Sequence, residues 1–303
     1  MKPRILITGS SGLVGSALKP ALEARQCEVI GLDHLATGSD FGDVRDIGHV
    51  RRAVDRCDGV VHLAAISRVL WGERDPELCR ETNVGGLRNI IETIHRRKNS
   101  PWLIFASSRE VYGQPETLPV SEYAQLRPMN VYGRCKVEGE QLIDSARCKG
   151  VRASTVRLSN VYGSTDDHAD RVIPAFARGA VMGQPLRIDG TENTFDFTHI
   201  DDTTRGLVAL VEHMTGGGDA PPPIHFLTGR PTTLLQLAEM AIDIAETDSE
   251  IRHAPPRSYD VARFYGDPSR AYDLLGWSPQ VRLREGLSRL IKDFRYELNT
   301  ADA

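Results

Sequence analysis

The feature that most constrains the fold is a series of short apolar segments without the alternation of a half-exposed strand. Strands that are buried on both faces have this composition, which is typical of a parallel sheet covered by helices. Between them lie stretches with helical spacing; in the first of these, Val14, Leu18 and Leu22 recur every fourth residue. The expected strands are 5–8, 28–33, 59–65, 102–108 and 153–159, and the expected helices are 12–25, 76–97 and 130–147. Strands alternating with helices predict an α/β fold, a doubly wound parallel sheet with right-handed crossovers.

A glycine-rich segment, Thr8 to Gly15 (TGSSGLVG), follows the first expected strand and opens the first expected helix. Glycines without a Cβ let the backbone turn tightly and approach a pyrophosphate, and a helix N-terminus offers free N–H groups to it. Asp33 ends the next strand about twenty residues later, where a carboxylate accepts hydrogen bonds from the adenosine ribose and repels a 2′-phosphate. This pattern predicts a Rossmann-type site for NAD rather than NADP. The alternatives are a plain glycine turn and a solvated loop carboxylate.

The second half of the chain is less regular. Residues 171–188 predict a helix and a short strand, 215–223 form a Gly/Pro-rich loop, and Thr232 or Thr233 is expected to cap a helix over 232–246. Another helix is expected over 284–298. We therefore expect two domains. Residues 1–160, joined again by 195–228, form the NAD-binding Rossmann domain, whereas 161–194 and 229–303 form mainly a smaller α/β substrate-binding lid over the carboxyl edge of the sheet.

Composition excludes several classes of function. The net charge is −4 with acidic and basic residues intermixed, so no basic block suggests a nucleic-acid partner. No apolar run approaches the roughly 18 residues of a membrane span, and the apolar run near the start is too short for a signal peptide. The five cysteines form no CxxC pair and no metal-ligand cluster. We expect reduced cysteines, no metal, no membrane association and a cytoplasmic location.

Tyr132 and Lys136 are separated by four residues, which places them on one face of the helix expected over 130–147. A lysine ammonium in this position stabilises a tyrosinate and lowers the pKa of the phenol toward working pH. Tyr132 would then act as a general acid or base. Taken alone, such a pair is a common accident of sequence, and its meaning depends on the motifs around it.

Those motifs resemble the extended short-chain dehydrogenase/reductase family, in particular its nucleotide-sugar epimerases, dehydratases and decarboxylases. The resemblance extends over nearly the whole chain. It rests on TGSSGLVG (8–15), GDVRD (42–46), HLAA (62–65), ETNVGGLRN (81–89), SSREVYG (107–113), YGRCK (132–136), RLSNVYG (157–163), the stretch 171–190, FDFTHIDD (195–202) and PPRSYDV (255–261).

The resemblance implies a role for individual residues. Tyr132 is the catalytic base, Lys136 binds the nicotinamide ribose, and Ser108 hydrogen-bonds the 4-hydroxyl of the sugar. Asn83 has a mainly structural role, and Asp260 accompanies Arg257 in holding the nucleotide. The cofactor-binding residues are Gly9, Ser11, Gly12, Leu13, Val14, Asp33, Asp43, Val44, Leu63, Ala64 and Ala65, together with Tyr132 and Lys136. The substrate-binding residues are Ser67, Ser108, Arg109, Asn160, Arg187 and Arg257. A nucleotide-diphosphate sugar is the implied substrate, and a homodimer through the helices of 76–97 and 130–147 the implied assembly.

The chain departs from the family pattern at two places. Phe195-Asp196-Phe197 stands where many relatives have Arg-Asp-Phe, so a diphosphate contact is missing unless Arg187 or Arg257 compensates. Ser108-Arg109-Glu110 separates the subfamilies poorly, because epimerases have small or hydroxyl residues after the serine whereas dehydratases and decarboxylases retain the glutamate. Glu110 is either a base that acts next to a ketone or a loop carboxylate paired with Arg109. Arg109 either meets a substrate carboxylate or phosphate or points to water.

Three functions follow from this pattern. The first is 4-epimerisation, in which Tyr132 takes the proton of the C4 hydroxyl while hydride moves to NAD, and hydride then returns to the opposite face of the ketone. The second uses the same oxidation to enable 4,6-dehydration or uronic-acid decarboxylation, with Glu110 as a fourth catalytic residue. The third is a non-catalytic dinucleotide-binding regulator, although such relatives typically lack the tyrosine or the lysine.

Overall fold

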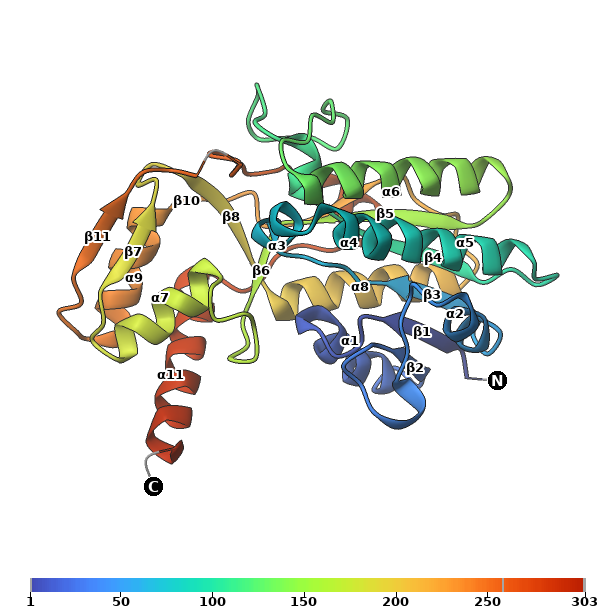
Figure 1. The fold of residues 1–303 in the computed structure, drawn as a ribbon, viewed down its shortest axis with the longest axis horizontal. Coiled ribbons are helices and arrows are strands. Elements are labelled where there is room, and N and C mark those ends of the chain that lie inside the picture. Colours follow the sequence, from blue (N-terminus) through green and yellow to red (C-terminus); the bar gives the residue numbers. More distant parts are fainter. Residues whose placement is uncertain (1, 258, 302–303) are drawn as a thin grey trace.

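The computed structural model describes residues 2–257 and 259–301. A six-stranded sheet in which all neighbouring strands are parallel forms its larger part (Figure 1). The strands lie in the order β2 (Glu28–Leu32), β1 (Arg4–Thr8), β3 (Gly59–His62), β4 (Trp102–Ser108), β5 (Ala153–Leu158) and β9 (Ile224–Phe226). The order reverses at β1, which has β2 on one side and β3 on the other. The expected doubly wound α/β fold of the Rossmann type is confirmed.

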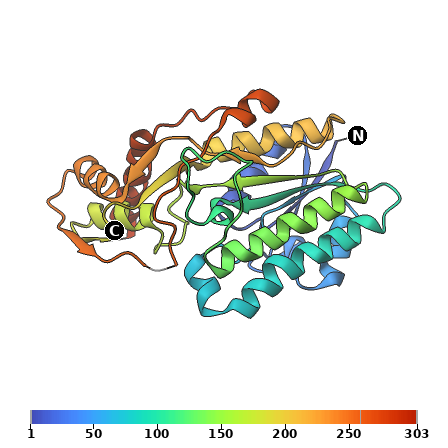
Figure 2. The same cartoon turned by 90° about the horizontal axis from the view of Figure 1, so that it is seen from above.

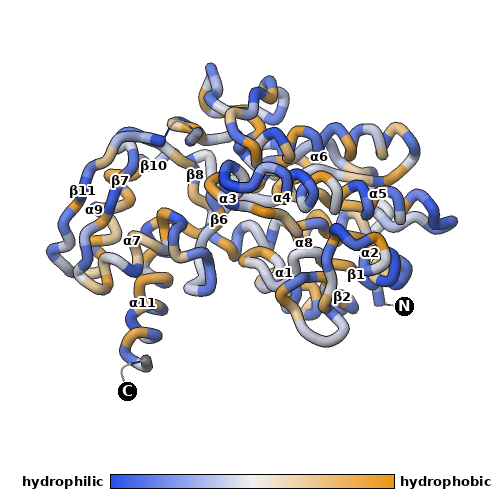
Figure 3. Tube along the Cα trace, in the orientation of Figure 1, coloured by the Kyte–Doolittle hydropathy of each residue, from blue (hydrophilic) through white to orange (hydrophobic). Residues whose placement is uncertain are grey.

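Helices cover both faces of this sheet, which explains why its strands are apolar without alternation (Figure 2). One face packs against α1 (Leu13–Glu23), α8 (Ile200–Thr215) and α10 (Ser269–Leu275). The other packs against α2 (Ile47–Val54), α5 (Gly86–His95) and α6 (Val131–Cys148). The hydropathy colouring shows apolar strands inside and hydrophilic turns of α2 and α5 outside (Figure 3). Since α10 packs on α8, part of the last 75 residues belongs to this larger unit.

A smaller α/β unit lies beyond the carboxyl ends of the strands. Its first sheet has β8 (Thr194–His199) between β10 (Pro231–Thr233) and β6 (Asn160–Tyr162), and its second pairs β7 (Leu186–Asp189) with β11 (Ile251–Ala254). Its core is formed with α7 (Val172–Val181), α9 (Leu234–Ala245) and α11 (Leu283–Ala301). Thr233 caps α9 through a capping box with Gln236. Because β8 belongs to this small sheet, the chain returns to the large one only at α8.

The segment expected as one helix over 76–97 is divided. It consists of α4 (Pro76–Arg80), the π-helical turn η2 (Glu81–Gly85) and α5, and a further short helix, α3 (Val69–Arg74), precedes it. Asn83 in η2 donates to the carbonyl of Ile66 at 3.1 Å and accepts from its N–H at 2.8 Å. The widened turn thus accompanies a polar contact that fixes the loop after β3, a feature that hydrophobic spacing cannot reveal. Within the described residues no helix is long and apolar enough to cross a bilayer.

Two buried histidines should make the fold sensitive to acid. Burial lowers the pKa of His62 and of His225 to about 3, whereas an imidazole in an unfolded chain titrates near pH ~6.5. Between these values the unfolded chain binds protons that the folded chain excludes. The free energy of unfolding should therefore fall with decreasing pH below about 6.5, by up to about 1.4 kcal/mol per pH unit for each histidine.

Urea unfolding at a series of pH values measures this slope. A His62→Gln variant removes one of the two excluded protons, so its slope should be smaller than that of the parent protein by up to about 1.4 kcal/mol per pH unit. Equal slopes for the two proteins would show that His62 is not held neutral in the fold.

Candidate active site

A pocket of about 830 Å³ opens at the carboxyl ends of the large sheet, where the strand order reverses at β1. Residues of both units line it, including the loops after β1, β3 and β4, the start of α6, the start of α7 and the segment after β11. Ligands of open α/β sheets bind at such a reversal point, because the loops after the neighbouring strands separate there.

The glycine-rich loop between β1 and α1 is shaped both by packing and by space for a ligand. Gly9 has φ +73°, and a Cβ there would lie 2.7 Å from the backbone nitrogen of Ala64; a Cβ at Gly15 would lie 2.2 Å from the carbonyl oxygen of Gly9. A Cβ at Gly12 would meet only that same oxygen, at 3.5 Å. Packing therefore does not require glycine at Gly12, although it lines the pocket. Gly12 at the N-cap of α1 has no side chain to cap the helix, and within the described part of the chain no other side chain does so; the first N–H groups are therefore available to an anion such as a pyrophosphate.

Asp33, just after β2, is buried at the same end of the pocket. Its carboxylate accepts from the N–H of Ser11 at 3.0 Å and from that of Leu35 at 2.8 Å, which fixes its position beside the glycine loop. The other expected cofactor-binding residues lie around it, since Leu13, Val14, Asp43, Val44, Leu63, Ala64 and Ala65 all line the pocket. This lining fits a dinucleotide, with donors for its pyrophosphate and a fixed carboxylate for a ribose.

The expected catalytic residues meet where β4 ends and α6 begins. Ser108 is the last residue of β4, and the Asn130 side chain caps α6 by accepting from the N–H of Gly133 at 2.7 Å. Tyr132 and Lys136 lie on the inner face of α6, 8% and 3% exposed. The Lys136 Nζ donates to the carbonyl oxygen of Ala106 at 2.6 Å and lies 5.7 Å from the centre of the Tyr132 ring. All three side chains line the pocket.

The expectation of a lowered tyrosine pKa is wrong for this structure. Burial raises the pKa of Tyr132 to about 12, and hydrogen bonding with Ser108 and the positive charge of Arg171 only partly oppose this. Burial also lowers the pKa of Lys136 to about 8. Spacing on a helix shows that the two side chains share a face, but it does not show how completely that face is removed from water.

Glu110 and Arg109 form a buried pair directly after Ser108, in the short helix η3 (Arg109–Tyr112). Arg109 Nη2 lies 2.8 Å from Glu110 Oε1 in an ion pair, and the Asn130 side chain donates to Glu110 Oε2 at 2.8 Å, so both carboxylate oxygens are engaged. The Arg109 guanidinium also lies over the Phe195 ring, 4.7 Å from its centre. Of the alternatives for Glu110, this geometry is that of the paired carboxylate; Arg109 does not point to water.

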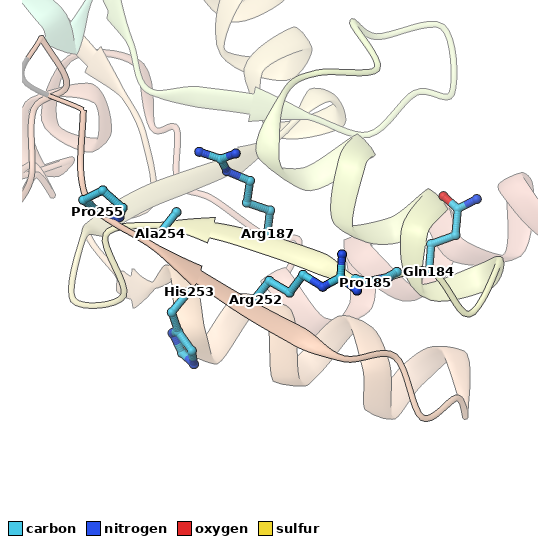
Figure 4. A pocket seen from close by; sticks show the side chains of 7 residues that line it. All are labelled: Gln184, Pro185, Arg187, Arg252, His253, Ala254 and Pro255. Atoms are coloured by element: carbon cyan, nitrogen blue, oxygen red, sulfur yellow. The ribbon is translucent and has the colours of Figure 1, made fainter.

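The substrate-binding residues expected from the sequence are only partly brought together. Ser67, Ser108, Arg109, Asn160 and Arg257 line the pocket. Arg187 does not: it extends from β7 into a separate shallow pocket near Arg252, its side chain 72% exposed and paired with Asp189 at 2.8 Å (Figure 4). In β7, Leu186 and Ile188 face the core formed with α7 and α9, so Arg187 between them faces solvent. The sequence does not show which face of this strand the helices cover.

The Nε atom of Arg257 lies 3.0 Å from Oδ2 of Asp260 and 3.5 Å from Oδ2 of Asp189. Asn160, on β6, donates to the backbone oxygen of Asp196 at 3.3 Å. Both residues reach the pocket from the smaller unit, opposite the glycine loop.

Arg171 is a pocket residue for which the sequence suggested no role. It precedes α7, donates to the Ser67 hydroxyl at 3.2 Å and lies 3.5 Å from Asp167. Its charge acts on the Tyr132 phenol, in the direction expected of Lys136. The sequence offered only a weak signal, an arginine at the start of an expected helix, because its neighbour Ser67 is 104 residues away in the chain.

The comparison of the sequence with known families agrees with this site. Residues 5–221, which include the glycine loop, Tyr132 and Lys136, match the NAD dependent epimerase/dehydratase family. The chain belongs to this family. Its cofactor is NAD.

Relatives within the family include enzymes that catalyse different reactions. The UDP-glucuronic acid decarboxylase 6 of Arabidopsis thaliana is 31% identical, over 97% of this chain and 90% of its own. The structure of UDP-glucose 4-epimerase from Thermotoga maritima with UDP-glucose has a TM-score of 0.89 at 29% identity, covering 97% of this chain and 99% of its own. That of the Thermus thermophilus UDP-glucose 4-epimerase with NAD has a TM-score of 0.85 at 27% identity, over 96% and 99%.

Proposed function

We propose that the protein is an NAD-dependent nucleotide-sugar 4-epimerase. The observation that supports this choice concerns three polar side chains that line the pocket, those of Ser108, Tyr132 and Glu110. The side chains of Ser108 and Tyr132 line the pocket with their hydroxyl groups, whereas Arg109 and Asn130 engage both oxygens of Glu110. Epimerisation needs only the hydroxyl pair; elimination calls for an additional group that removes the C5 proton, and decarboxylation for one that protonates C5 once carbon dioxide has left.

In the proposed reaction Tyr132 removes the proton of the sugar C4 hydroxyl, and Ser108 orients that hydroxyl. Bound NAD supplies a reversible hydride acceptor. The Lys136 ammonium is held at the pocket by its hydrogen bond to the carbonyl oxygen of Ala106. A buried tyrosine with a high pKa is a poor base in the free protein, so positive charge has to be present before proton transfer. Arg171 already acts on the phenol at this pKa, so the further positive charge would come from the nicotinamide of bound NAD.

After the 4-keto sugar turns over within the pocket, Tyr132 returns the proton to the C4 oxygen of the epimer. Tyr132 takes the proton in the first half-reaction and gives it back in the second, so the reaction needs no second acid–base group. We further propose that Arg257, Asn160 and Ser67 bind the nucleotide diphosphate end, because they lie on the pocket walls and present donors suited to phosphate. Arg187 is left out of this set.

The second candidate is dehydration, with Glu110 removing the C5 proton, or decarboxylation, with Glu110 as the acid that protonates C5. Its support is that Glu110 lines the pocket beside Ser108 and that UDP-glucuronic acid decarboxylases are among the relatives. A regulator without catalysis has less support, because Tyr132 and Lys136 are both present at the pocket.

Incubation with a panel of nucleotide sugars separates these functions. We expect a product of unchanged mass with inverted C4, and we expect Glu110→Gln to retain activity within about 10-fold because it removes no acid–base group of the reaction. Glu116→Gln, at an exposed carboxylate paired with Arg127, is the matched control. A product lighter by water or carbon dioxide, with Glu110→Gln arrested after oxidation, would establish the second candidate instead.

We also propose that two copies of the chain associate through α5 and α6. The exposed side chains of these helices include Arg88, Glu92 and Arg134, so such a contact would be largely polar.

A further inference from the structure

A buried carboxylate lies farther along the catalytic face of α6. Tyr132, Lys136 and Glu140 follow one another at four-residue spacing and share one face of the helix. Glu140 is 5% exposed and accepts a hydrogen bond from the hydroxyl of Ser107 at 2.5 Å. Ser107 is the neighbour of Ser108 at the end of β4, so this contact joins the strand that carries one catalytic hydroxyl to the helix that carries the other.

Arg157 on β5 holds this carboxylate in place. Its Nε–H donates to Glu140 Oε1 at 2.9 Å and an Nη2–H donates to Oε2 at 2.6 Å, a bidentate pair with fixed geometry. An Nη1–H of the same arginine donates to the Tyr112 hydroxyl at 2.6 Å. Tyr112 is the last residue of η3, which begins directly after Ser108. One guanidinium is therefore linked to both sides of Ser108.

A neutral histidine completes the arrangement around Tyr112. The Nδ1 of His225 faces the carbonyl oxygen of Asp267 at 3.1 Å, and since a carbonyl only accepts, Nδ1 carries the proton. The Nε2 of His225 then accepts from the Tyr112 hydroxyl at 2.6 Å. The donors therefore all point the same way along this chain of hydrogen bonds. Arg157 donates to Tyr112, and Tyr112 donates to His225.

We infer that Glu140, oriented by Arg157, is a positioning residue that sets the placement of Ser108 relative to Tyr132 through the hydroxyl of Ser107; the inference rests on the proposed function. Apolar packing between a helix and a sheet is non-directional and tolerates small shifts. The contacts Ser107–Glu140 and Ala106–Lys136 are directional and join β4 to α6 at successive residues. A misplacement of 1 Å at reacting groups costs up to about 100-fold in rate.

Ser107→Ala tests this inference with Ser154→Ala as its control. Ser154 lies on the adjacent strand β5, is equally buried, and its hydroxyl has no hydrogen-bond partner among the residues that the structure describes. We expect Ser107→Ala to lower kcat by about 10-fold, a fraction of the full misplacement effect, with KM for the sugar unchanged within about twofold. Ser154→Ala should leave both constants unchanged, and Ser107→Thr, which keeps the hydroxyl, should restore most of kcat.

A purely structural role would give a different pattern, in which kcat falls only as far as the folded fraction measured by urea unfolding. That pattern, or equal kcat for Ser107→Ala and Ser154→Ala, would overturn the inference. If the parent protein reduces its NAD on mixing with a nucleotide sugar but forms no epimer, the proposed function fails, and the comparison is then made on the rate of nicotinamide reduction.

If no nucleotide sugar reduces the cofactor, crystal structures of the NAD-bound parent and variants decide the point. We expect the distance from Ser108 Oγ to Tyr132 Oη to lengthen in Ser107→Ala and to stay the same in Ser154→Ala. An unchanged distance in Ser107→Ala would overturn the positioning role independently of any activity.

Discussion

Replacing Tyr132 by phenylalanine is expected to lower kcat by about 10²- to 10⁴-fold, the range typical of a lost acid–base group. The phenol lies in the pocket between Ser108 and the Lys136 amine, and no other residue there is placed by this mechanism to take the C4 proton. Phenylalanine keeps the buried ring, so folding and NAD binding should be retained. The measurement is steady-state epimerisation together with NAD affinity by titration calorimetry.

Tyr123→Phe is the matched control, since Tyr123 is 87% exposed and lies outside the pocket. It should show the activity of the parent protein. If Tyr132→Phe retained activity within a few fold of the control, Tyr132 would not be the proton acceptor, and the proposed chemistry at the end of β4 would be wrong.

Replacing Arg157 by leucine is expected to destabilise the fold by about 3–5 kcal/mol. The side chains of Arg157 and Glu140 are 5% and 6% exposed, so removal of the arginine leaves a carboxylate buried without its cation. Tyr112 and the backbone oxygen of Glu122 also lose a donor. Urea unfolding, extrapolated to water, measures this change.

Arg25→Leu provides the comparison, because the ion pair of Arg25 with Glu212 is 58% and 48% exposed. An exposed pair contributes at most about 1 kcal/mol, so this variant should unfold close to the parent protein. A similar small effect for Arg157→Leu would mean that water or another cation compensates Glu140, and the buried network would then be of little importance to stability.

Much of the fold could be predicted because its signals are local. The strands β1, β2, β4 and β5 lie within one or two residues of the expected segments, since a run of apolar residues between turn signals identifies a doubly covered strand. The strand expected over 59–65 ends at His62 instead, because Leu63 and Ala64 turn toward the pocket. Periodicity alone cannot locate such an end, since small and apolar residues suit both situations.

For the candidate site, the sequence indicated which residues line the pocket, but it did not indicate their ion pairs, hydrogen bonds and pKa values. The glycine loop, Asp33, Ser108, Tyr132 and Lys136 line one pocket, as the spacing of their motifs indicated. The engagement of Glu110 by Asn130 and the contact of Arg171 with Ser67 join residues 20 and 104 positions apart. Neither pairing leaves a mark in local sequence.

The sequence by itself determined the alternation of strands and helices, the glycine loop at the end of β1 and the common helix face of Tyr132 and Lys136. These properties depend on residues within one or two turns or strands of each other. The tertiary structure alone decided the raised pKa of Tyr132, the pairing of Glu110, the exclusion of Arg187 from the pocket and the bidentate contact of Arg157 with Glu140. Charge interactions depend on burial and on partners, and both are supplied by segments that only folding brings together.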